Sequence, residues 1–495
     1  MKKKLLSLTA VIIGLSLCSV TAFAADITAT PAKSWSNFFD YLAQCPVAIA
    51  VAAASAVVVL ALIIFRKPLA KKLDNSSSAQ MINAFIALFA VCGIGTFAMA
   101  LVSDGVTFGH LLHSENTSTG ATFHFYDYLN TLRDAGSKNF EQGGYDYSPM
   151  SLLIFYVIAQ FMPTKYIFSA GFPALIQMSR NQTFIYCYLI ILMLLIVFTY
   201  KLNRNMLRHN GCRFRNELFA FLLVISYPAL YCIKLGNIVG LSYAFLMFFI
   251  AFRDSEKRSV KEFALLSLAM SAAITPYTII FILLFFTKDK NSLYNCSKAL
   301  LYSVALFIAP AFFTGFGNMA QYIKNLFIIP ESLSIENIAI SNIFRFIGID
   351  NNAVIYVLSA VFEIIALGCI FILPTAWQKS AAAVYFIINL VPSEPNAILL
   401  LVFIPLVLML AEKAHKAIDW LYLAAFALLI LPVPEWFWAD RADFSAMFES
   451  LEFFVVHNAN ELVAPFAVQL IFVLIVCQSI SALIKNKKKK SLPTE

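Results

Sequence analysis

Charged side chains are scarce in this sequence. Asp, Glu, Lys and Arg make up only 13% of the 495 residues, whereas 60% are hydrophobic and the mean hydropathy is +0.78. So few charges exclude a soluble protein of this length, because it would leave much of its apolar surface in water. The net charge of +8 comes from short basic clusters between apolar runs, which is typical of inner membrane loops rather than of nucleic-acid binding. The composition therefore indicates a polytopic membrane protein with no nucleic-acid partner.

Sequence motifs for metal, nucleotide or thiol chemistry are also missing. The nine Cys include no CxxC pair and no zinc-type spacing, so we interpret them as small apolar packing residues. There is no P-loop, no GxSxG and no dinucleotide fingerprint. His110, His113 and His124 share a polar segment with acidic residues, which leaves a metal site as a weak alternative. We expect no metal and no cofactor.

The N-terminus has the three parts of a bacterial secretory signal. A basic start and an apolar run lead to Ala22-Phe23-Ala24, which fits a cleavage site, and an uncleaved first span is the alternative. We divide the chain into residues 1–25 (signal peptide or first span), 26–80 (N-terminal membrane anchor), 81–485 (transmembrane core) and 486–495 (basic cytoplasmic tail).

Apolar length and basic flanks predict the membrane spans and their orientation. The predicted spans are residues 45–65, 82–102, 182–200, 217–233, 238–252, 262–275, 277–287, 299–316, 352–373, 380–391, 396–411, 417–432 and 462–485. Crossing them in order places the basic clusters on the cytoplasmic side and the long loops 103–181, 317–351 and 433–461 outside. We interpret 262–287 as a broken or re-entrant pair.

Residues 150–161 are apolar, but this segment is too short to cross a bilayer. We expect it to lie at the outer interface, because a crossing here would place the cluster "KLNRNMLRHNGCRFRN" outside. The prediction is therefore an all-α polytopic protein of the bacterial cytoplasmic membrane. It has a bundle of about 11–14 transmembrane helices and a large first external loop that carries a surface helix.

Asp127, in "FHFYDYLN" of that external loop, is the first candidate for chemistry. A carboxylate among aromatic residues at an interface is partly desolvated, which makes it a stronger base. An Asp that caps a surface helix is the structural alternative. Asp104, Asp134 and Asp146 lie in the same loop and compete for the same role.

Two further segments have both a structural and a functional interpretation. In "YDYSPM", Ser148 fits a helix N-cap and Pro149 fits a first helical turn. Gly236-Asn237 falls at an outer turn between two spans, either as a plain tight turn or where a helix N-terminus receives an anion.

The segment "NIAISNIFRFIG" combines Asn337, Asn342 and Arg345 in an external loop that returns to the membrane. Arg345 is a lone cation among apolar neighbours. An Arg in such a place binds a phosphate or carboxylate, or extends toward lipid headgroups.

Five short segments between about residues 82 and 430 occur together in a recognisable order. They are "FYDYLN" with Asp127 and Asn130, "YSPM" with Tyr147 and Pro149, the Gly236-Asn237 turn, "VKEFALLSLAMSAA", and "NIAISNIFR" with Asn337, Asn342 and Arg345. In this set the chain resembles the GT-C-fold membrane glycosyltransferases of glycosyltransferase family 87, the alpha-mannosyltransferase-like group. The resemblance makes residues 81–485 a GT-C-like core.

The chain departs from the pattern of that family at three positions. It has Thr275 in "TPYT" where relatives often carry a Lys, which removes one expected contact to a lipid phosphate. It has "YSP" in place of "YPP", and Ala339 stands where a Ser is usual.

The resemblance implies transfer of a hexose, mannose-like, from a polyprenyl-phosphate donor to a lipid or glycan acceptor on the outer face. It implies Asp127 as the general base of an inverting reaction and Arg345 as the phosphate-binding residue. The implied sugar or headgroup contacts are Asn130, Tyr147, Gly236, Asn237, Asn337 and Asn342. One carboxylate suffices because a phosphate leaves without protonation, unlike the leaving group of a glycosidase.

Two other functions remain open. A transporter or flippase of lipid-linked sugars would share the many spans, although transporters tend to place polar residues at mid-membrane and to contain repeats. A non-catalytic membrane assembly protein would explain the substituted motifs.

Overall fold

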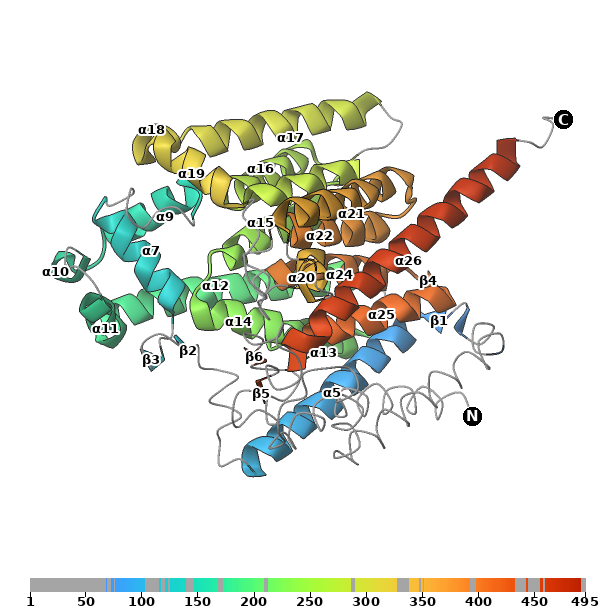
Figure 1. Ribbon diagram of the computed structural model, residues 1–495, viewed down its shortest axis with the longest axis horizontal. Helices are drawn as coiled ribbons and strands as arrows, with labels where there is room; N and C mark the ends of the chain where they lie inside the picture. The colour runs from blue at the N-terminus through green and yellow to red at the C-terminus, as the bar shows by residue number, and fades with distance from the viewer. Residues whose placement is uncertain are drawn as a thin grey trace.

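The structure, a computed structural model, describes most of the predicted core (Figure 1). The described residues are 68, 73–74, 76–102, 115–116, 121–122, 125–138, 147–167, 172–208, 212–285, 290–326, 338–346, 349, 351–391, 398–431, 442–443, 455–456 and 459–490. The predictions for residues 1–25 and 45–65, and for Asp104, His110, His113, His124, Asp146 and Asn337, lie outside them.

The chain is an all-α membrane protein. Its helices are α5 (Ser78–Val102), α7 (Tyr126–Gly136), α9 (Pro149–Ala159), α10 (Thr164–Ile167), α11 (Phe172–Arg180), α12 (Gln182–Met206), α13 (Arg213–Val224), α14 (Tyr227–Leu235), α15 (Val239–Phe252), α16 (Arg258–Ile274), η3 (Pro276–Phe285), α17 (Lys290–Ile308), α18 (Ala311–Thr314), α19 (Phe316–Leu326), α20 (Ile340–Phe346), α21 (Asn352–Ile372), α22 (Ala376–Leu390), η4 (Leu399–Val402), α24 (Phe403–Ala411), α25 (Ala417–Ile430) and α26 (Ala459–Lys490). Three pairs of two-residue strands complete the described elements: β1 (Ser76–Ser77) with β4 (Ala414–His415), β2 (Glu115–Asn116) with β3 (Ala121–Thr122), and β5 (Ala442–Asp443) with β6 (Val455–Val456).

Five helices of the described chain are long and apolar enough to cross a membrane. They lie at Ser78–Gly95, Gln182–Met206, Ser292–Thr314, Asn352–Ile372 and Ala464–Ile484. The other apolar helices have 10–17 residues. The five long helices support a membrane protein, and the predicted number of spans stays a prediction.

Two of the predicted spans are interrupted. The span predicted at 217–233 is bent, because α13 and α14 meet at an angle of 45°. Pro228 stands in the first turn of α14, where its missing N–H and its ring oppose a continuous helix. The break expected within 262–287 is present, because α16 ends at Ile274 and η3 begins at Pro276.

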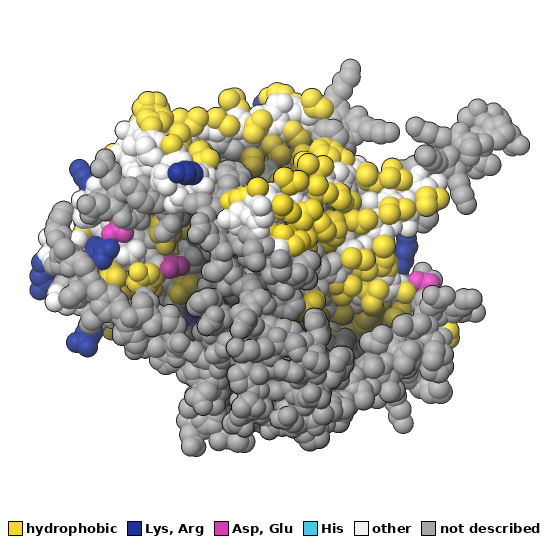
Figure 2. All heavy atoms as spheres, in the orientation of Figure 1, with side chains coloured by type: hydrophobic (Ala, Val, Ile, Leu, Met, Phe, Trp, Pro, Cys, Tyr) yellow, Lys and Arg dark blue, Asp and Glu magenta, His cyan; other side chains and the backbone are white. Residues whose placement is uncertain are grey.

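The buried core lies where α15, α16, α22, α24 and α25 pack together, and α22 and α24 are apolar around most of their circumference. Hydrophobic side chains also cover the outer surface over α17 and α21 (Figure 2). Leu301, Val357 and Ile364 are examples, each about two thirds exposed. Such a surface is stable against lipid and not against water.

The four helices α7, α9, α10 and α11 form a separate group at one end of the molecule (Figure 1). A cluster of buried apolar residues, including Leu129, Leu132 and Phe155, holds this group together. Ser148 caps α9 by accepting a hydrogen bond from the Ser151 backbone N–H, and Pro149 is in its first turn. The predicted N-cap and first turn are therefore confirmed.

Candidate functional site

Asp127 lies in the first turn of α7 and is half-buried. The Asn237 side-chain amide donates a hydrogen bond to Asp127 Oδ2 at 2.9 Å. The Thr131 hydroxyl donates to the Asp127 backbone carbonyl at 2.6 Å, which keeps this first turn closed. A carboxylate at a helix N-terminus is also stabilised by the helix dipole. These contacts hold the Asp127 side chain in a fixed position.

The start of α7 is strained and is held from outside the helix. Phe125 has a φ of 62°, in the left-handed region that bulky residues avoid. Its backbone N–H donates to the Lys234 carbonyl at 2.7 Å, and its ring lies 4.4 Å from the ring of Tyr188. Contacts from α14 and α12 thus hold the backbone next to Asp127 in place.

The Gly236-Asn237 turn brings the second half of the site to Asp127. Gly236 has a φ of +72°, and a Cβ atom there would lie 2.6 Å from the Cβ of Tyr128. Only glycine fits this combination of backbone conformation and close approach. The interpretation as a tight turn therefore holds.

Both ends of the Asn237 amide are used. Its Oδ1 accepts a hydrogen bond from the Val239 N–H at 2.9 Å, so Asn237 caps the start of α15, while its Nδ2 donates to Asp127. The N-terminus of α15 therefore already has an acceptor of its own, which weakens the expectation of an anion there. The side chain acts instead as a rigid link between two helices.

Asp134 and Asn130 both contact Arg133, which lies between them on α7. Arg133 forms an ion pair with Asp134 at 2.8 Å and donates to Asn130 Oδ1 at 2.8 Å. Burial raises the pKa of the Asp134 carboxyl above its ordinary value, although the Arg133 guanidinium opposes this shift. Asp134 is nearly inaccessible and serves the packing of α7, whereas Asn130 lies one turn after Asp127.

The remaining predicted residues, Tyr147, Asn342 and Arg345, lie on or next to other helices than α7. The half-buried ring of Tyr147 packs on Phe155 within the α7–α9 cluster, with ring centroids 6.5 Å apart. Asn342 is buried on α20, which packs against α21 and α26 rather than against the neighbours of α7. Arg345 lies on the same helix, and its side chain is outside the described part of the structure.

An apolar groove begins beside Asn237, the hydrogen-bond partner of Asp127. Tyr128, Gly236 and Asn237 line one end of it. Its walls come from α9, α12, α13, α14, α15, η4 and α24. One stripe of α12 lines its length, through residues 188, 191, 192, 195, 196, 199 and 203. This groove was not predicted from the sequence, although the residues of α12 that line it have helical spacing.

Thr275, where family relatives often carry a Lys, is buried and engaged in hydrogen bonds. Its hydroxyl bonds to that of Ser242, which also meets the Ser271 hydroxyl at 2.8 Å. The Ser271 hydroxyl reaches that of Thr278 at 3.0 Å. These four hydroxyls join α15, α16 and η3, so this position serves helix packing and offers no phosphate contact.

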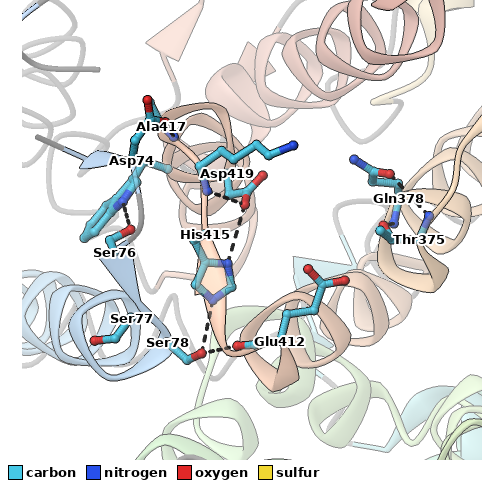
Figure 3. Close-up of polar contacts among 12 residues, drawn as sticks. Asp74, Ser76, Ser77, Ser78, Thr375, Gln378, Glu412, His415, Ala417 and Asp419 are labelled. Atoms are coloured by element: carbon cyan, nitrogen blue, oxygen red, sulfur yellow. Dashed lines mark hydrogen bonds and ion pairs between the residues drawn. The ribbon is translucent and has the colours of Figure 1, made fainter. Parts of the chain in front are cut away.

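A second polar cluster joins the start of α5 to the α24–α25 connection (Figure 3). His415 Nε2 lies 3.1 Å from Ser78 Oγ, and His415 Nδ1 lies 3.5 Å from Asp419 Oδ2. The order of groups matches a Ser-His-Asp triad. However, the Ser78 hydroxyl donates its proton to the Glu412 carbonyl, and Ser78 is only 3% exposed.

This second cluster therefore has a structural role. A nucleophilic Ser must donate its proton to the His and must be open to substrate, and neither condition is met. Neighbouring contacts strengthen the same connection: Ser76 pairs with His415 in the β1–β4 ladder, and Trp420 donates to the Ser76 hydroxyl at 2.8 Å. No sequence motif indicates this cluster, because its two halves are more than 330 residues apart.

No group of three or more His, Cys, Asp or Glu in the described part of the chain is placed to hold a metal ion. No protein-family model, curated protein or solved structure matches this chain.

Proposed function

We propose that this protein is a membrane glycosyltransferase with a GT-C-like bundle of about 11–14 transmembrane helices. It moves a mannose-like hexose from a polyprenyl-phosphate donor to a lipid or glycan acceptor on the outer face of the cytoplasmic membrane. One observation carries the proposal: the Asp127 carboxylate accepts a hydrogen bond from Asn237, and Asn237 lines an apolar groove between membrane helices. A polar reacting group beside an apolar groove suits a substrate with a lipid chain and a sugar headgroup.

Asp127 acts as the general base in this proposal. Its carboxylate takes the proton from the acceptor hydroxyl, and the hydroxyl oxygen attacks the anomeric carbon from the side opposite the phosphate. The bond between that carbon and the phosphate oxygen breaks, and the phosphate leaves with the electron pair, so the configuration inverts. Base assistance of this kind contributes roughly 10²- to 10⁴-fold in rate.

The other residues bind or position. Asn237 fixes the Asp127 carboxylate, and Gly236 allows the turn that brings Asn237 to it. Asn130 and Tyr147 contact the sugar or headgroup. Arg345 binds the departing phosphate, and Asn337 and Asn342 contact the sugar or headgroup.

The orientation follows from the basic residues at the other end of α12. Arg204 and Arg213 flank the α12–α13 connection and both approach Glu217, at 3.7 and 2.7 Å. Basic residues concentrate on the cytoplasmic side, so Asp127, at the opposite end of α12, faces outward.

The test is sugar transfer by the purified full-length protein in detergent, with a panel of short-chain polyprenyl-phosphate hexoses. Asp127→Asn should lower transfer at least about 100-fold without changing the folded fraction. Asp134→Asn, on the same helix, is the matched control and should retain transfer. Equal transfer by wild type and Asp127→Asn would contradict the role of this base. Donor binding with no turnover of any donor would favour the flippase or assembly function.

A further inference from the structure

Gly240, in the first turn of α15, lines the groove close to the Asp127 site. Its backbone N–H donates to the carbonyl of Asn237 at 3.3 Å, and the Asn237 amide donates to Asp127. The residues of α15 and its start that line the groove include Asn237, Gly240, Leu241 and Tyr243. Their spacing of three or four residues places them on one face of the helix. Gly240 is therefore part of the groove wall one turn from the residue that holds Asp127.

Gly240 does not serve close packing between helices. Glycines in membrane helices commonly let a neighbouring element approach, and at Gly236 the missing Cβ atom does this for Tyr128. At Gly240 an added Cβ atom would meet no heavy atom of the described chain within 4 Å, and the residue is partly exposed. The missing side chain therefore makes the groove wider at this point by one methyl group, compared with any other residue.

We propose that Gly240 makes the groove selective for a methyl-branched lipid chain. The inference rests on the proposed function, in which the chain of a polyprenyl phosphate enters the groove beside Asn237. A prenyl chain carries a methyl branch on each isoprene unit, whereas a straight alkyl chain carries none. Such a branch packs against the Gly240 backbone, where any other residue would place its own Cβ atom. Burying one methyl group strengthens binding by about fourfold.

Two substitutions of Gly240 should have graded effects. Gly240→Ala fills the space of the branch and should weaken binding of a prenyl chain about fourfold, with little change for a straight chain. Gly240→Leu also blocks the path of the main chain, so it should weaken binding of both chains at least about tenfold, since each displaced methylene costs about fourfold. Both variants should fold, because the added Cβ meets open space and both residues favour a helix over glycine.

The experiment measures dissociation constants for two probes with the purified full-length protein in detergent. One is a short-chain polyprenyl monophosphate, and the other is a straight alkyl monophosphate with a main chain of the same length. The probes lack a sugar, so binding is measured without turnover. The matched controls are Gly368→Ala and Gly368→Leu. Gly368 lies on α21, away from the described wall of the groove, and an added Cβ there would also meet nothing within 4 Å. Thermal unfolding confirms that each variant is folded.

The preference for the prenyl probe over the alkyl probe should fall about fourfold in Gly240→Ala, and both probes should bind weakly to Gly240→Leu. Both Gly368 variants should bind the probes as the wild type does. An unchanged preference in Gly240→Ala, or unchanged binding in Gly240→Leu, would overturn the inference. The proposed function would still stand if the wild type binds the prenyl probe and Asp127→Asn loses sugar transfer. No binding of the prenyl probe by the wild type would overturn both.

Discussion

The Asn237 amide donates to the Asp127 carboxylate across 2.9 Å, although the two residues are 110 positions apart in the sequence. The same amide caps α15 through its oxygen, at the Val239 N–H. One side chain therefore fixes both the Asp127 carboxylate and the start of α15.

Asn237→Asp separates these two contacts. The new carboxylate still accepts from Val239, but it replaces a donor to Asp127 with a like charge, and two close carboxylates share a proton. We expect transfer at neutral pH to fall about 10- to 100-fold, since a hydrogen bond to a charged group contributes about 1.5–3 kcal/mol. The acid limb of kcat/KM should move to higher pH. A pH–rate profile checks this, and an unchanged acid limb would show that Asn237 does not act on Asp127.

Gly236→Ala should destabilise the protein by about 2–5 kcal/mol, from the left-handed backbone and the clash with Tyr128. Gly240→Ala is the matched control. It lines the same groove, its added Cβ would meet nothing within 4 Å, and alanine favours a helix. Thermal unfolding in detergent gives both values. Equal melting temperatures in the two variants would mean that the turn does not constrain the site.

The Ser78–His415–Asp419 cluster should behave as a structural connection. His415→Ala removes the buried ring that contacts the Ser78 hydroxyl and the Asp419 carboxylate, which should cost about 1–3 kcal/mol of stability. Ser78 should resist labelling by a fluorophosphonate, because it is buried and its proton is donated to the Glu412 carbonyl. Transfer per folded molecule should be unchanged in Ser78→Ala. Labelling of Ser78 would instead indicate a second, hydrolytic site.

Asp134 gives a prediction for the pH dependence of stability. Burial raises its pKa in the folded protein, so the native state binds this proton more tightly than the unfolded chain does. The stability that wild-type Asp134 contributes should therefore be greatest in acid. It should decline as the pH rises from about 4, the ordinary Asp value, through the raised value.

Unfolding of wild type and Asp134→Asn at several pH values measures this difference. The variant should gain stability relative to wild type as the pH increases from about 4 to 7. The opposite slope would mean that the ion pair with Arg133 outweighs the effect of burial.

Local sequence determined the membrane class of this protein and several of its helix ends and turns. Long apolar runs and scarce charge indicated a membrane protein. A long apolar segment is more stable in lipid than in water, whichever helices it packs against. The Ser148 cap, the turn at Gly236 and the break before Pro276 were also predictable, since each depends on the backbone preferences of a few adjacent residues.

Only the tertiary structure decided which of these segments meet. It joined Asp127 to Asn237, placed Asn342 on a helix that packs elsewhere, and brought Ser78 to His415. It also bent the predicted span at 217–233 and left a groove beside α12. Apolar membrane helices carry few side chains that specify a partner, so their contacts depend on how the surfaces of the whole bundle pack.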